Sequence, residues 1–193
     1  MNNLAPLMSS ARTGDINKDD YMSPLWLYEL LHKEFHFVLD TAASEENALC
    51  DFYFDKEADG LKSDWFGNSY TNPPYSQLYR WVMKGKHEAT HNKKVEHVVM
   101  LIPARTDTKA WWDAVRYGEV RFLPGRLKFR LGIINQEIVR LKNIERMASG
   151  KSALDPEKTS APFPSAIVVF RGAGKVYTPK TVYWNVREPT HAT

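Results

Sequence analysis

The stretch Glu96–Ala104 reads "EHVVMLIPA", and it decides the fold class. Its apolar, β-branched character is typical of a strand that is buried on both faces, as at the centre of a parallel sheet. Such a strand needs a crossover helix before it, and Ser76–Ala89 supplies one, with Ser76 as a cap and Leu78 and Trp81 on one face. The order therefore predicts right-handed crossovers in an open α/β sheet.

Working outward, the same kinds of signal place the other elements. Ser23-Pro24 opens a helix that runs to about Lys33, with Ser as the N-cap and Pro in the first helical position. Another helix follows the cap-type residues at 106–108 and ends at Gly118. Strands are expected at Phe35–Asp40, at Asp51–Phe54, in two pieces around the Pro-Gly turn of 118–130, at Pro164–Phe170, and as a last hairpin or edge within 175–186.

The domain layout is one domain over 21–186, after a loose lead-in at 1–20 and before a tail at 187–193. An insertion at about 131–160 interrupts the domain. Its first half predicts a helix with an apolar stripe from Ile134 to Ile144, and its second half is a polar, turn-rich loop. The stripe suits packing on the chain's own sheet or on a second subunit, so the oligomeric state is open.

Charge is distributed unevenly although the formal net charge is only +3. The stretch Asp40–Asp64 carries eight acidic residues against two lysines, whereas Arg116–Lys151 carries nine Lys and Arg against three Glu. Solvated surface is the ordinary fate of such charges. With Phe122 and Phe129 among its cations, the basic stretch also suits a polyanion whose bases can stack.

Composition excludes several classes of protein. No apolar run approaches the ~20 residues of a membrane span, and the first residues do not have the pattern of a signal peptide, so a cytoplasmic protein is expected. Cys50 is the single cysteine, which excludes an internal disulfide and a cysteine-based zinc finger. His87 and His91 have the spacing of a two-histidine metal face, but no third ligand is obvious and no metal is expected.

The tetrapeptide Asn72-Pro73-Pro74-Tyr75 stands at the carboxyl end of an expected strand, where open α/β sheets bind their ligands. Pro-Pro ends the strand and holds the spacing between the Asn72 side-chain oxygen and the Pro73 carbonyl. Two acceptors that face one point match an NH₂ group. Tyr75 offers a face on which the ring bearing that amine can stack, a contact worth ~1–3 kcal/mol. The alternative is a tight Pro-Pro turn without a function.

This arrangement suits methylation of a planar exocyclic amine. Acceptors placed for the transition state draw on the two N–H bonds and free the nitrogen lone pair without a strong base. The rest is a direct displacement at a methyl sulfonium. If the amine belongs to adenine in a duplex, the base has to be flipped into the pocket.

Several linked motifs resemble the phage-type DNA N-6-adenine methyltransferase (Dam-like) family. They are "YMSPLWLYELLHKEFHFVLDTAASEENALC", "DGLKSDW", "TNPPYS", "LIPARTDTKAWW", "GRLKF" and "APFPSAIVVF", in this order from Tyr21 to Phe170. The resemblance implies a Rossmann-like fold of S-adenosylmethionine-dependent methyltransferases, a mostly parallel sheet to which we assign an antiparallel edge strand. It implies S-adenosylmethionine as the donor, double-stranded DNA as the partner, adenine in GATC as the target, and a phage-encoded protein in the bacterial cytoplasm.

The resemblance also implies roles for individual residues. The catalytic tetrapeptide is Asn72, Pro73, Pro74 and Tyr75. The expected donor-binding residues are Ser23, Pro24, Asp40, Thr41, Ala42, Asp55, Asp64, Trp65 and Asn72. Asp55 has Asp51 and Glu57 as rivals for the donor ribose. The expected DNA contacts are Arg105, Arg126, Lys128, Arg130 and Arg140.

One departure from the pattern keeps alternatives open. Methyltransferases of this class generally have a glycine-rich loop after the first strand, whereas this chain has "LDTAASEEN" there. A related enzyme acting on an RNA amine or a protein glutamine amide is one alternative. A non-enzymatic DNA-binding protein that has lost its donor is another.

Overall fold

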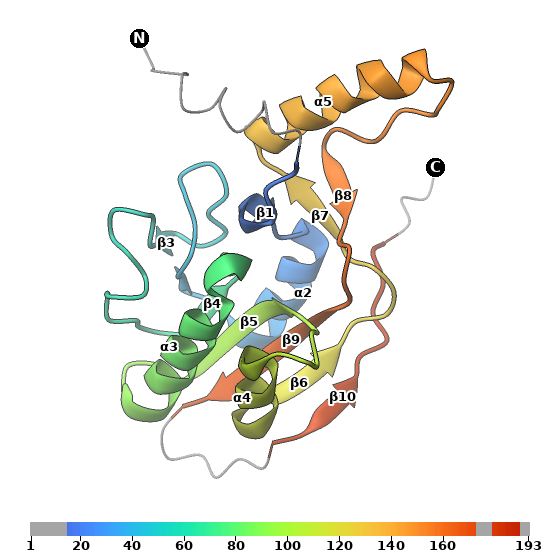
Figure 1. The fold of residues 1–193 in the computed structure, drawn as a ribbon. Helices are drawn as coiled ribbons and strands as arrows, with labels where there is room; N and C mark the ends of the chain where they lie inside the picture. The colour runs from blue at the N-terminus through green and yellow to red at the C-terminus, as the bar shows by residue number, and fades with distance from the viewer. Residues whose placement is uncertain (1–14, 173–178, 190–193) are drawn as a thin grey trace.

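A computed structural model describes residues 15–172 and 179–189 (Figure 1). The helices are α2 (Leu25–Phe35), α3 (Leu78–His91), α4 (Lys109–Tyr117) and α5 (Ile133–Ala148), with short 3-10 turns η1 (Lys18–Asp20) and η2 (Tyr75–Gln77). The strands are β1 (Tyr21–Met22), β2 (Leu39–Asp40), β3 (Phe52–Tyr53), β4 (Ser69–Thr71), β5 (His97–Pro103), β6 (Glu119–Phe122), β7 (Lys128–Leu131), β8 (Lys158–Ser160), β9 (Ser165–Arg171) and β10 (Thr181–Tyr183).

Seven strands form the main sheet in the order β10-β6-β9-β5-β4-β2-β3. Every neighbouring pair is parallel except β9 with β5 and β9 with β6. The mostly parallel Rossmann-like α/β sheet is confirmed. Its reversed strand, which we expected at the edge, lies inside the sheet, because β9 pairs along its whole length with β5 and shields it from the edge.

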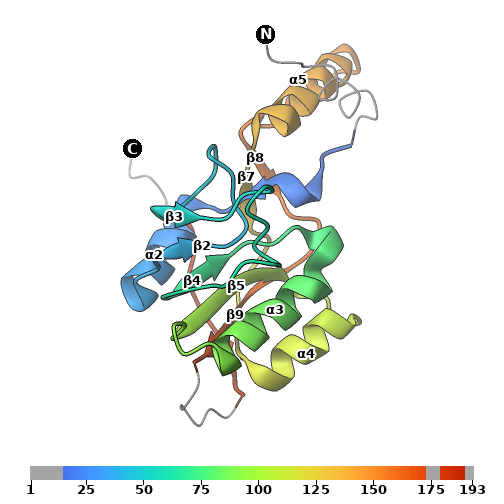
Figure 2. The ribbon, with the colours of Figure 1, turned by 90° about the vertical axis from the view of Figure 1, so that its left-hand side faces the viewer.

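Helices cover both faces of this sheet, with α2 on one side and α3 and α4 on the other (Figure 2). Successive side chains of the central strand β5 point to opposite faces of the sheet, so the strand contributes to the hydrophobic core on each face. Val99 and Leu101 join a cluster with Leu27 of α2, whereas Val98 joins a second cluster with Trp81 of α3. The strand is thus buried on both faces, as its sequence predicts.

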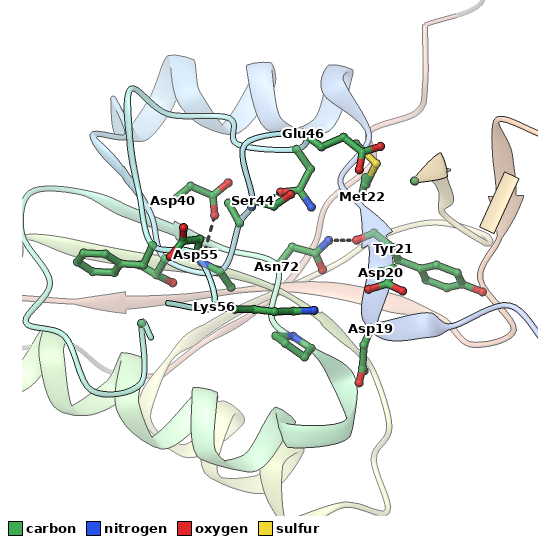
Figure 3. A pocket seen from close by; sticks show the side chains of 18 of the residues that line it. Asp19, Asp20, Tyr21, Met22, Asp40, Ser44, Glu46, Asp55, Lys56 and Asn72 are labelled. Atoms are coloured by element: carbon green, nitrogen blue, oxygen red, sulfur yellow. Dashed lines mark hydrogen bonds between the residues drawn. The ribbon is translucent and has the colours of Figure 1, made fainter. Parts of the chain in front are cut away.

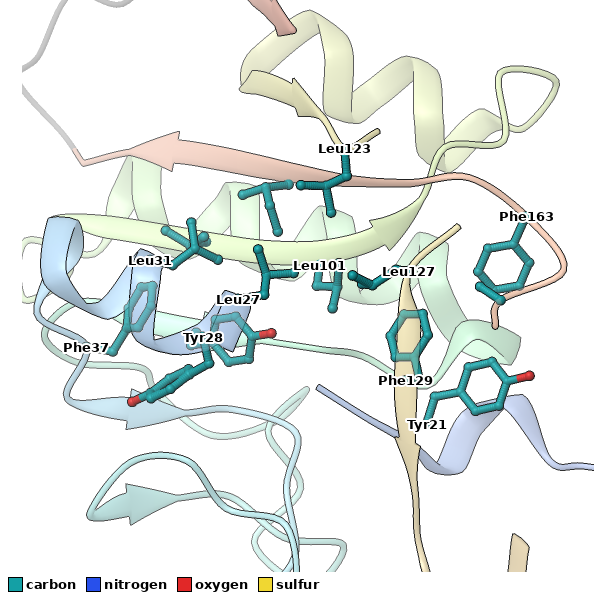
Figure 4. Packing of buried hydrophobic residues seen from close by; sticks show 14 of the residues in the cluster. Tyr21, Leu27, Tyr28, Leu31, Phe37, Leu101, Leu123, Leu127, Phe129 and Phe163 are labelled. Atoms are coloured by element: carbon teal, nitrogen blue, oxygen red, sulfur yellow. The ribbon is translucent and has the colours of Figure 1, made fainter. Parts of the chain in front are cut away.

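A second, small sheet stands beside the first, in the order β1-β7-β8. It leads to α5, which projects away from the main sheet (Figure 1). Tyr21 of β1 stacks on Phe129 of β7 with ring centroids 5.0 Å apart, next to Phe163 (Figure 4). The insertion is therefore a strand-helix-strand unit, and its β8 lies in the part that we expected to be a loop.

Two expected helix caps are wrong. Pro24 itself is the N-cap of α2, while the buried Ser23 hydroxyl accepts a hydrogen bond from the Tyr70 hydroxyl at 2.8 Å. Helix α3 starts after η2, and the Ser76 hydroxyl donates to the Asp19 carboxylate. Both serines therefore form hydrogen bonds with residues far away in the sequence and do not cap the helices that follow them. The cap Thr108 is confirmed for α4.

The apolar stripe on α5 is only partly buried. Ile138 is buried, but Leu141 and Ile144 are 46% and 67% exposed, because this half of the helix projects beyond the small sheet.

The ends of the chain also differ from expectation. Residues 18–20, expected to belong to a loose lead-in, form η1 with Asn17 as its N-cap, and Asp19 contacts Ser76 in the body of the protein. The C-terminal piece is a parallel edge strand, β10, and not a hairpin. Residues 1–14 of the lead-in, 175–178 of the C-terminal piece and 190–193 of the tail lie outside the described residues. Within the described ranges, no helix has the length and apolar character to cross a bilayer.

An ion-pair network ties α2 to β6. The buried Arg121 guanidinium donates to both Glu34 carboxylate oxygens and to Glu119, each at 2.6 Å. Arg171 and Lys180 also pair with Glu119, at 3.0 and 3.1 Å. Burial raises the Glu119 pKa, but the hydrogen bonds from Arg121, Arg171 and Lys180 outweigh it and lower the pKa to about 2.

Replacing Arg121 with Ala should lower the free energy of unfolding by about 3 kcal/mol, because it removes the link between α2 and β6 and leaves the buried Glu119 with fewer partners. Urea denaturation measures the loss. Arg140→Ala is the matched control, since Arg140 makes only an exposed pair with Glu137 at 3.4 Å and should cost under about 1 kcal/mol. Equal losses in the two variants would contradict this account of the network.

Candidate active site

Three neighbouring parallel strands bring their carboxyl ends to one place. Asp40 ends β2, Asp55 comes shortly after β3, and Asn72 follows β4 directly. All three line a cavity of about 630 Å³ (Figure 3). The cavity therefore lies at the edge of the sheet where the sequence predicts a ligand site.

The Asn72 side chain is held in one orientation. Its Nδ2 donates to the Tyr21 backbone carbonyl at 2.7 Å (Figure 3), and its Oδ1 accepts from the Tyr75 hydroxyl at 3.3 Å. Because a backbone carbonyl can only accept, this contact requires nitrogen on that side of the amide and oxygen on the other. An amide oxygen has two lone pairs, so Oδ1 keeps the capacity to accept a second hydrogen bond.

The rest of the tetrapeptide surrounds this amide. Pro74 lines the cavity, and no hydrogen bond between described residues ends on the carbonyl of the buried Pro73. The partly buried ring of Tyr75 packs edge-on against Phe163 at 5.4 Å and against Phe129 at 6.4 Å, behind the cavity lining. Burial raises the Tyr75 pKa well above its ordinary value, so its hydroxyl stays a hydrogen-bond donor.

The Asp40 carboxyl group is buried and weakly satisfied. Among the described residues, two groups donate to it, both over long distances: the Ala42 amide at 3.4 Å and the Leu49 amide at 3.3 Å. Burial raises its pKa to about 7, against the lowering effect of these two amides. A buried carboxyl with unused lone pairs, facing a cavity, is suited to accept hydrogen bonds from a ligand.

The loop after β2 folds without glycine. Among the described residues, positive φ outside glycine occurs only at His36 and Asp59, so none of the loop residues 41–51 needs it. The loop is closed by side chains and strand-like contacts: the Ser44 amide donates to Asn47 Oδ1 at 2.8 Å, and the Ala43 amide donates to the Phe54 carbonyl at 3.0 Å. Ala42, Ala43 and Ser44 thus line the cavity in ordinary backbone conformations.

Gly60 lines the cavity, although it is not among the expected site residues. A Cβ at position 60 would lie 2.1 Å from the Thr41 backbone oxygen, so the backbone here packs against the residue that follows β2 and leaves no room for a side chain. The Trp65 indole N–H donates to the Gly60 carbonyl at 2.7 Å and holds the loop there. Trp65 itself is fully buried, and Asp64 is exposed outside the cavity lining. The expected contact of this pair with the donor stays a prediction.

The other expected donor-binding residues are divided. Ser23, Thr41, Ala42 and Asp55 line the cavity, whereas Pro24 does not. Asp55 Oδ1 accepts the amides of Glu57 and Ala58 at 3.0 and 2.8 Å, which fixes the turn after β3. The Thr41 hydroxyl shares a 2.6 Å hydrogen bond with Thr71.

Charge around the cavity is mainly negative. Its lining carries six carboxylates against three cations: Asp19, Asp20, Asp40, Glu46, Asp55 and Asp59, with Lys56, Lys62 and Arg80. Asp19 and Asp20 belong to η1. They were not among the expected site residues, because the sequence of this segment shows no periodicity. The described residues contain no group of three or more His, Cys, Asp or Glu side chains placed to hold a metal ion.

The expected DNA-contacting cations lie on the small sheet, on α5 and beyond β5. Arg126 and Lys128 are exposed, Arg130 is half-buried, and no ion pair forms between these three and other described residues. The Arg105 guanidinium lies over the Phe163 ring, 5.4 Å from its centroid. Arg140 instead pairs with Glu137.

The sheet with one reversed strand, together with an Asn-Pro-Pro-Tyr corner at the carboxyl end of β4, defines the class: a Rossmann-like methyltransferase fold. The chain belongs to the DNA N-6-adenine-methyltransferase (Dam) family, whose model matches residues 10–154. That match includes the corner and most of the insertion, and it ends before β8 and β9.

Two phage proteins are similar to this chain. A DNA N-6-adenine-methyltransferase of Escherichia phage T1 is 34% identical over 107 residues, which is 54% of this chain and 43% of the relative. A DNA N-6-adenine-methyltransferase of Haemophilus phage HP1 (strain HP1c1) is 32% identical over 111 residues, which is 55% of this chain and 62% of the relative. The chain thus spans about half the length of the curated relatives that it matches.

The buried Asp40 carboxyl predicts an unusual dependence of stability on pH. Since its pKa is raised from 3.8 to about 7, the folded protein binds a proton that the unfolded chain releases near pH 4. The free energy of unfolding should therefore fall by about 2–3 kcal/mol from pH 5 to pH 8 relative to Asp40→Asn, in which this contribution is absent. Parallel denaturation of both proteins across this range measures it, and a constant difference would contradict it.

Proposed function

We propose that this protein is a site-specific DNA adenine methyltransferase, which transfers a methyl group from S-adenosylmethionine to the exocyclic amine of adenine in duplex DNA. The observation that carries the proposal is the fixed Asn72 amide at the cavity, with its oxygen able to accept from a substrate amine. Family membership and the two similar phage proteins support the same activity.

The cavity fits the donor. Its volume of about 630 Å³ lies within the roughly 300–1,000 Å³ that small-molecule sites occupy. When bound, S-adenosylmethionine supplies a methyl group on a positively charged sulfur for direct displacement by the amine. The excess of carboxylates suits a ligand with sulfonium and ammonium charges, and the unused lone pairs of Asp40 and Asp55 suit hydroxyl and amino donors.

The corner supplies the acceptor chemistry. Asn72 Oδ1 and the Pro73 carbonyl accept from the two N–H bonds of the amine, so that the nitrogen gives up its conjugation with the ring as it reacts. The Tyr21 carbonyl keeps the amide from flipping, and the prolines keep the two acceptors in register. Preorganisation of this kind lowers the barrier without a strong base.

The small sheet supports DNA as the partner. In its register Arg130 stands directly opposite Lys158, and like charges in that position repel each other unless an anion lies between them. Glu188 pairs with Lys158 at 3.2 Å and relieves only part of this repulsion. A phosphate backbone along Lys128, Arg130 and Arg126 relieves the rest.

Adenine in the word GATC, reached by base flipping, is the target that we propose, in the cytoplasm of a bacterial host where phage DNA is present. Incubation with DNA, followed by digestion with nucleases that differ in their response to methylated GATC, tests the target. Parallel incubations of labelled donor with RNA and with protein test the acceptor class, and label in either of these alone would overturn the proposal.

Replacing Asn72 with Ala should reduce methyl transfer more than about a hundredfold, because it removes one of the two acceptors and leaves the Tyr21 carbonyl without its donor. Donor affinity, measured by isothermal titration, should stay within about threefold. The control is Gln77→Ala, a second carboxamide at the cavity, whose oxygen accepts a hydrogen bond from Arg80 at 2.8 Å. Unchanged turnover in Asn72→Ala would exclude its catalytic role.

Replacing both Lys128 and Arg130 with Gln should weaken DNA binding and lower the slope of log affinity against log salt by about two, one for each lost phosphate contact. Turnover at saturating DNA should change little. Lys93→Gln with Lys94→Gln is the control, because these exposed lysines precede the amino end of β5, whereas the cavity lies at the carboxyl ends of the parallel strands. An unchanged salt slope in the first pair would show that DNA binds elsewhere.

A further inference from the structure

The segment Asn17–Met22 contacts both ends of the catalytic tetrapeptide. At the first end, the Tyr21 carbonyl accepts from Asn72 Nδ2 at 2.7 Å. At the other end, the residue after Tyr75 is Ser76, and its backbone amide and hydroxyl donate to the two oxygens of Asp19, at 2.9 and 2.5 Å. Figure 3 shows Asp19 and Tyr21 on the same side of Asn72.

The same segment is fixed to the insertion. Two hydrogen bonds of 2.9 Å join Asn17 to the Asn135 side chain. The Asn17 backbone N–H donates to Asn135 Oδ1, and Asn135 Nδ2 donates to the Asn17 carbonyl. Asn135 is fully buried, at the first turn of α5. Tyr21 and Met22 also pair with β7. The segment is therefore a rigid support and not a free strand end.

Fixing the two ends of the tetrapeptide fixes all of it. Its two middle residues are prolines, whose φ angles are restricted, and each residue before a proline is held to extended conformations, so much of the remaining freedom lies at the Asn72 side chain and at the step from Tyr75 to Ser76. The Tyr21 carbonyl removes the first freedom and the Asp19 carboxylate removes the second. Asp19 lines the cavity, so a direct role towards the donor is the competing explanation.

We propose that Asp19 is a positioning residue, which holds the Asn72–Tyr75 corner in its reactive geometry through Ser76. The proposal rests on the proposed function of that corner. Asp19 acts through hydrogen-bond acceptance and not through its charge, so Asn can replace it: Oδ1 accepts from the Ser76 amide, and Nδ2 donates to the Ser76 hydroxyl.

The test compares Asp19→Ala, Asp19→Asn and the control Lys18→Ala, an exposed neighbour in η1. Asp19→Ala should reduce the turnover number for DNA about tenfold or more, with donor affinity within about twofold, and Asp19→Asn should restore turnover to within about threefold. Loss of turnover in both Asp19 variants, with donor binding weakened in parallel, would overturn the proposal in favour of a charge contact with the donor. Unchanged turnover in Asp19→Ala would also overturn it.

Amide hydrogen exchange at Ser76, measured by NMR, separates this proposal from the proposed function. Exchange should be about tenfold faster in Asp19→Ala and return to the wild-type rate in Asp19→Asn, whatever the substrate of the enzyme. Equal exchange rates in all variants would overturn the positioning role even if the wild type methylates adenine. A wild type that does not methylate adenine overturns the proposed function alone.

Discussion

The hydrogen bond from the Asn72 side chain to the Tyr21 carbonyl is the contact on which the candidate site depends. A carboxamide can turn over at little cost in free solution, and then its nitrogen would face a substrate amine and repel it. The Tyr21 carbonyl removes that possibility because it accepts only. It is itself fixed by the pairing of β1 with β7, so the orientation of one side chain draws on strand pairing, on the Asn17–Asn135 contact and on the aromatic packing around Phe129.

The main features of the fold were predictable because they leave a local signal. An apolar run such as β5 indicates burial on both faces, and cap residues such as Thr108 mark a helix start. The place of β9 inside the sheet leaves no such signal, since a buried strand has the same composition in either direction. The small sheet was missed because β1 has only two residues, too few for a period of two to show.

The site was predictable where it consists of strand ends. Open α/β sheets bind ligands at the carboxyl ends of their strands, and this rule alone indicates Asp40 and Asn72. The family resemblance added Ser23 and Thr41, which also line the cavity. The burial of Trp65 could not be predicted from its neighbours in the sequence: its ring, which the resemblance assigns to the donor, lies in the core, and its N–H donates to the Gly60 carbonyl. Asp19 could not be predicted, because its partner Ser76 is 57 residues away and nothing in either neighbourhood indicates the contact.

The most direct test of the Tyr21–Asn72 contact is the unfolding free energy of Asn72→Asp as a function of pH. An ionised carboxylate would place an oxygen where Nδ2 now donates, facing the Tyr21 carbonyl at 2.7 Å, whereas the protonated acid can donate to it. The account predicts a loss of about 2 kcal/mol relative to wild type at pH 8, most of which is recovered as the pH falls from about 6 to about 4 and the carboxyl gains its proton. A variant as stable as wild type throughout this range would contradict it.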